Sequence, residues 1–244
     1  MLVLSITFLN ICMNRENAMD SHPITPFAFP GIRWLKAPRR ETATDTAQIA
    51  DTVATVLADV RREGDAAVRR YSAQFDKSDI AAFEVPMADR LAAVAELDPQ
   101  TRADTEFAIG NVTAFAKAQL ATILPLDVEI RAGVFMGHRV IPIERVGCYV
   151  PGGRFPLLSA PVMTIVPAKV AGVDEVIACL PPNAHRAMIA GCHLAGADRI
   201  FRIGGAQAIA AMAHGTETVP QVVKIVGPGN AFVNEAKRQV FGSV

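Results

Sequence analysis

Apolar positions in the first half of the chain recur at the three- and four-residue spacing of helices. Between residues 41 and 122 they form successive stripes, with charged residues on the other faces, and this pattern predicts an α-helical section. Gly64 and Asp65 interrupt the first stripe and would end one helix and begin the next. Pro99 suits the start of the last helix, because proline is tolerated at the first helical position. The stripes run through residues 49–60, 67–75, 87–97 and 100–121.

The pattern changes at about residue 123. Helical spacing gives way to short β-branched runs that charged residues or glycines separate. Runs of this kind predict hairpin-like strands. We expect them at residues 128–130, 134–135 and 140–143.

From residue 146 onward, short apolar runs alternate four times with helical stretches. The strands are expected at residues 146–150, 176–180, 200–203 and 222–226, and the helices at 156–172, 184–195, 206–213 and 230–241. Apolar strands that alternate with helices predict a parallel sheet covered on both faces, and right-handed crossovers make it doubly wound. The predicted fold class is therefore α/β, Rossmann-like but without a GxGxxG fingerprint. We divide the chain into a leader and Pro-rich arm (1–40), a helical section (41–122) and an α/β domain (123–244).

Three of these strands end in glycine-containing turns, YVPGG, RIGGAQ and VGPGN. Ligands of open α/β sheets bind outside the carboxyl ends of the strands, and the N-terminus of the following helix offers free N–H groups to an anion. One interpretation is therefore a site for a nucleotide or another phosphate-bearing ligand. The alternative is that the glycines only terminate strands in tight turns.

Polar side chains stand at the same strand ends. Tyr149 closes the first strand, Gln207 opens the third helix, and Asn230 occupies an N-cap position after the fourth strand. Each also has a purely structural interpretation. Tyr149 would be a core aromatic residue whose hydroxyl reaches the edge of the core. Gln207 would be a solvated residue in the first turn of its helix, and Asn230 would serve only as a helix cap.

Charge and composition exclude several classes of function. Lys and Arg total 24 and Asp and Glu total 24, so the formal net charge is zero. Proteins that bind nucleic acids or anionic membrane surfaces usually carry an excess of basic residues, which this chain lacks. We therefore expect neither a nucleic acid nor a membrane as partner. Apolar residues make up 51% of the chain and charged residues 20%, which is typical of a folded domain with a core.

The four cysteines have neither CxxC nor zinc-finger spacing and are too sparse for a disulfide framework. Cys148 and Cys179 lie in apolar runs, where we interpret them as buried small hydrophobes. A reducing, cytoplasmic compartment fits this usage. The N-terminal run MLVLSITFLNICM is too short to span a bilayer and lacks the features of a signal peptide, so we interpret it as a dispensable leader with Met19 as the natural start.

Catalytic groups are not visible in the residue pattern. The five histidines show no HExxH or paired spacing, and no GxSxG motif occurs. The residues alone therefore predict an α/β domain with a nucleotide site.

Longer motifs are more specific. The segments VGCYVPGG, VPAKVAGV, GGAQAIAAMAHGTETVP and KIVGPGNAFVNEAKRQVFG closely resemble the histidinol dehydrogenase family. The earlier segment DVRREGDAAVRRYSAQFD is similar to a helix motif of the same family. The resemblance covers roughly residues 40–244.

The resemblance implies an NAD-dependent, zinc-containing homodimer that acts on a small molecule. Such an enzyme oxidises a primary alcohol through an aldehyde to a carboxylate, here L-histidinol to L-histidine in histidine biosynthesis. The family's NAD-contacting positions fall on Tyr149, Gln207 and Asn230. The resemblance therefore implies that residues 123–244 form an NAD-binding domain, which we expect to be incomplete at its C-terminus.

The chain departs from the family pattern in two places. The resemblance puts the zinc ligands and the catalytic acid–base residues beyond Val244, so we expect neither in this chain, and a truncated, catalytically inactive NAD-binding fragment is one alternative. The loop after YVPGG begins Arg154-Phe155-Pro156, which resembles a branch that oxidises sulfopropanediol. Arg154 would suit an anionic substrate group, or would be a solvated loop charge.

Overall fold

A computed structural model describes residues 43–152 and 156–244 of the chain. The leader, Met19 and the Pro-rich arm lie outside the described residues. No helix in the part that the structure describes combines the length and the apolar character needed to cross a membrane.

The predicted helical section forms four helices. The first apolar stripe is buried along one side, with Val53 and Val60 fully inaccessible to solvent. Gly64 separates the first two helices in a left-handed conformation with φ 57°. The side chain of Asp98 caps the last helix by accepting a hydrogen bond from the Thr101 N–H at 2.8 Å. The helices are α1 (Ala43–Glu63), α2 (Asp65–Phe75), α3 (Met87–Ala95) and α4 (Pro99–Leu120).

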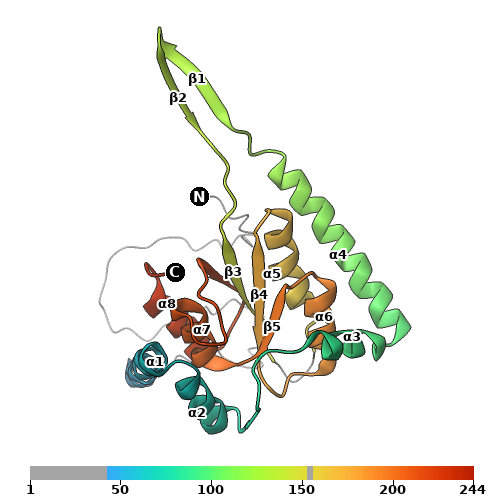
Figure 1. Cartoon of the computed structure of the whole chain (residues 1–244), viewed down its shortest axis with the longest axis vertical. Coiled ribbons are helices and arrows are strands. Elements are labelled where there is room, and N and C mark those ends of the chain that lie inside the picture. The colour runs from blue at the N-terminus through green and yellow to red at the C-terminus, as the bar shows by residue number, and fades with distance from the viewer. Residues whose placement is uncertain (1–42, 153–155) are drawn as a thin grey trace, which may run out of the picture.

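Two of the three expected hairpin strands are present. Strands β1 (Leu126–Arg131) and β2 (Val134–His138) pair in an antiparallel hairpin that projects away from the body (Figure 1). The prediction of a third strand at residues 140–143 is wrong, because these residues form an extended connection to the sheet and pair with no described strand. Pro142 lies in its middle, and a proline has no N–H to donate to a ladder.

The α/β part forms a four-stranded sheet with the order β5-β4-β3-β6. All neighbouring strands are parallel, and this is the order of the first four strands of a doubly wound fold. The predicted fold class is confirmed. The strands are β3 (Arg145–Tyr149), β4 (Glu175–Leu180), β5 (Arg199–Arg202) and β6 (Lys224–Val226), and the helices are α5 (Ser159–Val170), α6 (Arg186–Leu194), α7 (Gly205–His214) and α8 (Ala231–Val240).

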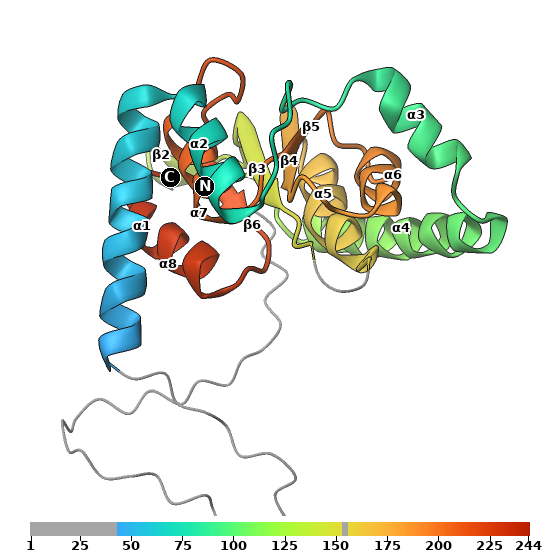
Figure 2. The same ribbon diagram turned by 90° about the horizontal axis from the view of Figure 1, so that it is seen from below.

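Helices cover both faces of this sheet (Figure 2). On one face, α3 packs on α6 and α4 on α5, while on the other face α1 packs on α7 and α8 and α2 packs on α7. The four N-terminal helices are thus divided between the two faces. The domain boundaries drawn from the sequence stay a prediction.

The segment between α2 and α3 carries the chain from one face to the other along the edge strand β5. It pairs there with backbone hydrogen bonds from Val85 N–H to the Ile200 carbonyl and from Arg202 N–H to the Phe83 carbonyl, both at 2.8 Å. These bonds satisfy the edge of β5. They also hold the C-terminal end of α2 at the same side of the sheet as the carboxyl ends of the strands.

Candidate nucleotide site

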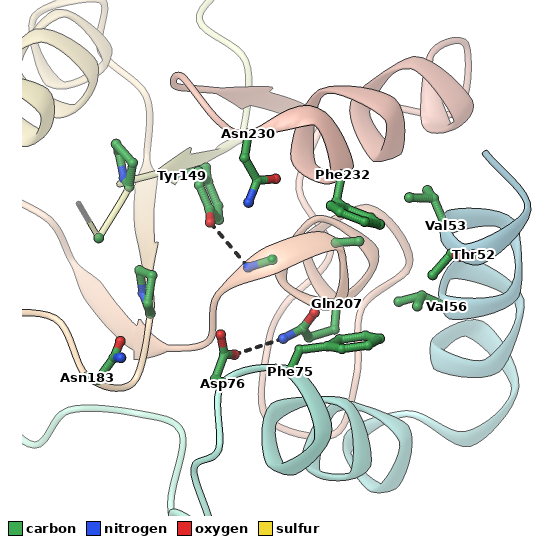
Figure 3. A pocket seen from close by; sticks show the side chains of 15 residues that line it. Thr52, Val53, Val56, Phe75, Asp76, Tyr149, Asn183, Gln207, Asn230 and Phe232 are labelled. Carbon is green, nitrogen blue, oxygen red and sulfur yellow. Dashed lines mark hydrogen bonds between the residues drawn. The ribbon is translucent and has the colours of Figure 1, made fainter. Parts of the chain in front are cut away.

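A cavity of about 430 Å³ opens at the carboxyl ends of the parallel strands (Figure 3). The strands β3 and β6 lie next to each other, and the helices that follow them pack on opposite faces of the sheet, which is the switch point where α/β proteins bind ligands. The turns after β3, β4, β5 and β6 contribute to the wall, and α1 and α2 close it. The lining residues are Thr52, Val53, Val56, Phe75, Asp76, Tyr149, Pro151, Gly152, Pro181, Asn183, Gly205, Ala206, Gln207, Asn230 and Phe232.

Tyr149 lies at the end of β3 and is 4% exposed. Its hydroxyl oxygen accepts a hydrogen bond from the Gly205 N–H at 3.2 Å, so it satisfies one of the free N–H groups at the start of α7. Burial raises the pKa of the Tyr149 hydroxyl above its ordinary value. The hydroxyl therefore stays protonated at neutral pH, and its proton remains to be donated to an acceptor in the cavity.

Gln207 lies in the first turn of α7 and is fully buried. The interpretation of Gln207 as a solvated residue is wrong, because α1 and α2 pack on α7 and shield it from solvent. Its side-chain Nε2 donates a hydrogen bond to Asp76 Oδ2 at 2.9 Å, whereas its Oε1 is buried and has no hydrogen-bond partner among the residues that the structure describes. A buried acceptor without a donor costs about 1–3 kcal/mol. This carbonyl oxygen therefore indicates a ligand that brings a hydrogen-bond donor.

Asn230 is the N-cap of α8. Its Oδ1 accepts a hydrogen bond from the Val233 N–H at 3.0 Å, so its capping role is confirmed. The same side chain lines the cavity. Because the oxygen is used for the cap, the amide nitrogen is the group that Asn230 can offer to a ligand.

The turn before Asn230 approaches the end of β3 very closely. Gly227 has a left-handed φ of 115°, and a Cβ at this position would lie 2.0 Å from the carbonyl oxygen of Tyr149. The Lys237 ammonium donates a hydrogen bond to the Gly227 carbonyl at 2.8 Å and helps to fix this turn. A glycine is therefore needed for the strand ends to converge on the cavity.

Asp76 is the functional candidate that the sequence reasoning missed. It follows the last residue of α2 and is the one charged side chain among the lining residues that the structure describes. Burial raises the pKa of its carboxyl group, and the hydrogen bond from Gln207 acts in the opposite direction. Asp76 is the final residue of the motif DVRREGDAAVRRYSAQFD, and this position was the signal that could have identified it.

The sequence analysis also did not predict the apolar wall of the cavity. Val53 and Val56 of α1, together with Phe75 and Phe232, face the cavity from the side opposite Asn183 (Figure 3). Such a wall suits a flat ring of a ligand.

The remaining candidates do not add a metal centre. Arg154 lies outside the described residues. Within residues 43–152 and 156–244, no three His, Cys, Asp or Glu side chains are grouped so that they could hold a metal ion. Cys148 and Cys179 are free and fully buried, as predicted, and burial raises the pKa of the Cys148 thiol to about 12. These thiols are not reactive groups of the site.

Comparisons with known proteins cover nearly all of the described residues. The family model described as histidinol dehydrogenase matches residues 39–244. A histidinol dehydrogenase of Methanosarcina mazei is 47% identical over 198 residues, which are 80% of this chain and 46% of that protein. A sulfopropanediol 3-dehydrogenase of Ruegeria pomeroyi is 39% identical over 217 residues, which are 87% of this chain and 50% of that protein.

A solved structure supports the same relationship. The crystal structure of histidinol dehydrogenase from Elizabethkingia anophelis superposes with a TM-score of 0.75 at 30% identity. The match covers 83% of this chain and 50% of that chain. The chain therefore spans about half the length of the relatives that it matches.

Proposed function

The chain belongs to the histidinol dehydrogenase family, and on this basis we propose that it forms the NAD-binding part of an NAD-dependent alcohol dehydrogenase. One observation carries the proposal. The buried Gln207 Oε1 has no hydrogen-bond partner in the described part of the chain, and Gln207 lines a cavity at the switch point of a doubly wound sheet. Dinucleotides are among the ligands that such sheets bind at this place, and the family resemblance favours NAD.

The lining residues divide into groups suited to different parts of a dinucleotide. The Tyr149 hydroxyl and the Asn230 amide nitrogen are donors, and they suit the pyrophosphate oxygens together with the N-termini of α7 and α8. Gln207 Oε1 is an acceptor for a hydroxyl or amide group. Phe75 and Phe232 offer apolar surfaces to a ring. We propose Tyr149, Gln207 and Asn230 as cofactor-binding residues.

The proposed reaction is the oxidation of a primary alcohol through an aldehyde to a carboxylate, with L-histidinol as substrate and L-histidine as product. NAD, when bound, accepts the hydride in each of the two oxidation steps. The residues of this chain bind the cofactor and hold it at the sheet edge. The family resemblance also implies zinc, but the described residues supply no ligand set for it, so we derive no step through a metal.

A second candidate substrate is a sulfonated diol. The support comes from the relative named sulfopropanediol 3-dehydrogenase, which matches 87% of this chain. Arg154, in the loop that resembles that branch, is our proposed substrate-binding residue and would supply the positive charge that a sulfonate needs. Assays of the protein that carries this chain, with L-histidinol and with dihydroxypropanesulfonate, separate the two substrates by the rate of NADH formation.

We also propose that the protein is a cytoplasmic homodimer that acts on a small molecule, with neither a nucleic acid nor a membrane as partner. The balanced charge of 24 basic and 24 acidic residues supports the exclusion of nucleic acid. Light scattering of the purified protein tests the dimer.

Cofactor binding is tested by titrating NAD into the purified chain in a calorimeter. We expect saturable binding, and Asn230→Asp weakens it because the aspartate keeps the helix cap but replaces the amide donor with a negative charge. Asp98→Asn is the matched control, since Asp98 caps α4 and does not line the cavity. An absence of binding by the unmodified chain would contradict the proposal.

A further inference from the structure

We propose that Asp76 binds the adenosine ribose of the dinucleotide and thereby selects NAD over NADP. The inference rests on the proposed NAD site. It assigns cofactor selectivity to a residue of the N-terminal helical section, outside the sheet that forms most of the cavity.

The sheet itself lacks the acidic residue that would do this. In dinucleotide-binding folds, an Asp or Glu at the end of the second strand of the βαβ unit accepts hydrogen bonds from the ribose hydroxyls. Here β4 is that strand, and it is followed by Pro181, Pro182 and Asn183. Asn183 lines the cavity but carries no charge. A carboxylate that binds the ribose would therefore come from another element.

Asp76 is placed to be that carboxylate. It lines the same cavity as Asn183 and Gln207 and lies between them in the view of Figure 3. Packing of α2 on α7 brings it there, and the hydrogen bond from Gln207 Nε2 to Asp76 Oδ2 fixes its orientation. No hydrogen bond from a described residue reaches the second carboxylate oxygen, Oδ1, which remains for a ligand.

The two side chains together present acceptors. Gln207 Oε1 is buried without a donor among the described residues, and Asp76, whose Oδ2 accepts the hydrogen bond from Gln207 Nε2, keeps Oδ1 as a second, charged acceptor. A ribose carries two neighbouring hydroxyl groups, which can donate to two such acceptors. The 2′-phosphate of NADP removes one of these donors and brings negative charge to a wall that has no cationic side chain among its described residues. The same pair thus favours NAD and disfavours NADP.

The test compares NAD and NADP binding by calorimetry for the whole chain and for Asp76→Asn. The asparagine can still accept the hydrogen bond from Gln207 Nε2, so the substitution removes mainly the charge. We expect NAD affinity to fall about 10- to 100-fold, as for the loss of a charge-assisted hydrogen bond, and the preference for NAD over NADP to shrink by a similar factor. Asp76→Glu, which retains the carboxylate, should keep NAD as the preferred cofactor.

Asp79→Asn is the matched control, because Asp79 lies three residues further along the chain and does not line the cavity. It should leave both affinities unchanged. A second measurement needs no variant: the unmodified chain should bind 2′-deoxy-NAD about tenfold more weakly than NAD.

Two results would overturn the assignment. One is an unchanged preference for NAD over NADP in Asp76→Asn, whether or not both affinities fall, and the other is equal affinity of the unmodified chain for NAD and 2′-deoxy-NAD. In each case NAD still binds, so the proposed function stands. If the unmodified chain binds neither dinucleotide, the proposed function fails together with this inference.

Discussion

Gly227 lies so close to Tyr149 that a Cβ on Gly227 would stand 2.0 Å from the Tyr149 carbonyl oxygen. The contact joins the turn after β6 to the end of β3, the two strands that border the switch point. The spacing between these turns therefore depends on the absence of a side chain at one residue.

Gly227→Ala should destabilise the fold by about 3 kcal/mol or more, because it combines a backbone clash with a left-handed φ of 115°. The measurement is the free energy of unfolding from urea titrations followed by circular dichroism. Gly110→Ala is the control, since a Cβ at Gly110 meets nothing within 4 Å. That change within α4 should stabilise the protein by about 0.5–1 kcal/mol. Similar effects of the two substitutions would contradict the prediction.

Tyr149→Phe should reduce both stability and NAD affinity. The change leaves the Gly205 N–H without its acceptor, at a cost of about 1 kcal/mol, and removes the hydroxyl from the cavity. NAD affinity, measured by calorimetry, should fall about fivefold or more.

Tyr71→Phe is the matched control for this change. Tyr71 is also a buried tyrosine, and its hydroxyl donates a hydrogen bond to Asp59 Oδ2 at 2.7 Å. Tyr71 does not line the cavity. Tyr71→Phe should lower stability and leave NAD affinity as it is. If both variants lose affinity equally, the effect of Tyr149 is not local to the cavity.

The sequence predicts the sheet and part of its site because both depend on local patterns. Alternation of apolar strands with helices determines the parallel sheet, and parallel strands bring their carboxyl ends to one edge. Tyr149, Gln207 and Asn230 each directly follow or close a strand or its turn, and all three line the cavity. Their roles toward NAD stay a prediction.

Asp76 and the burial of Gln207 could not be predicted in this way. Their hydrogen bond joins residues 131 positions apart and arises only because α2 packs on α7. A stripe of apolar residues shows that a helix is amphipathic, but it does not show which helix covers that stripe. The strand expected at 140–143 was wrong for a related reason, because a β-branched run forms a strand only where a partner and free N–H groups are available.

Glu235→Gln should change the dependence of stability on pH. Arg238 and Gln239 donate hydrogen bonds to the Glu235 carboxylate at 2.6 and 2.7 Å, and they lower its pKa from 4.5 to about 2. The folded state therefore favours the carboxylate, whose stabilising effect is complete above about pH 5 and is lost as the pH falls toward 2.

The measurement for Glu235 is the free energy of unfolding at a series of pH values between about 2 and 6. The difference between the unmodified chain and Glu235→Gln should be constant at the upper end and decrease toward the lower end. Because the Arg238 side chain is 69% exposed, added salt should reduce the difference. If the free energies of unfolding of the two proteins differed by the same amount at every pH in this range, the pKa of Glu235 would not be lowered in the folded state.

Gln207→Met should separate binding from stability. The substitution removes a buried acceptor for which no described residue is a donor, and this gain offsets the loss of the hydrogen bond to half-buried Asp76. We expect the free energy of unfolding to change by less than about 1 kcal/mol, whereas NAD affinity should fall about tenfold or more. Gln221→Met is the control, because Gln221 donates to the Ala213 carbonyl at 3.0 Å and lies outside the cavity. It should cost stability without changing NAD affinity. A large loss of stability in Gln207→Met with unchanged affinity would mean that the buried amide serves the fold rather than the ligand.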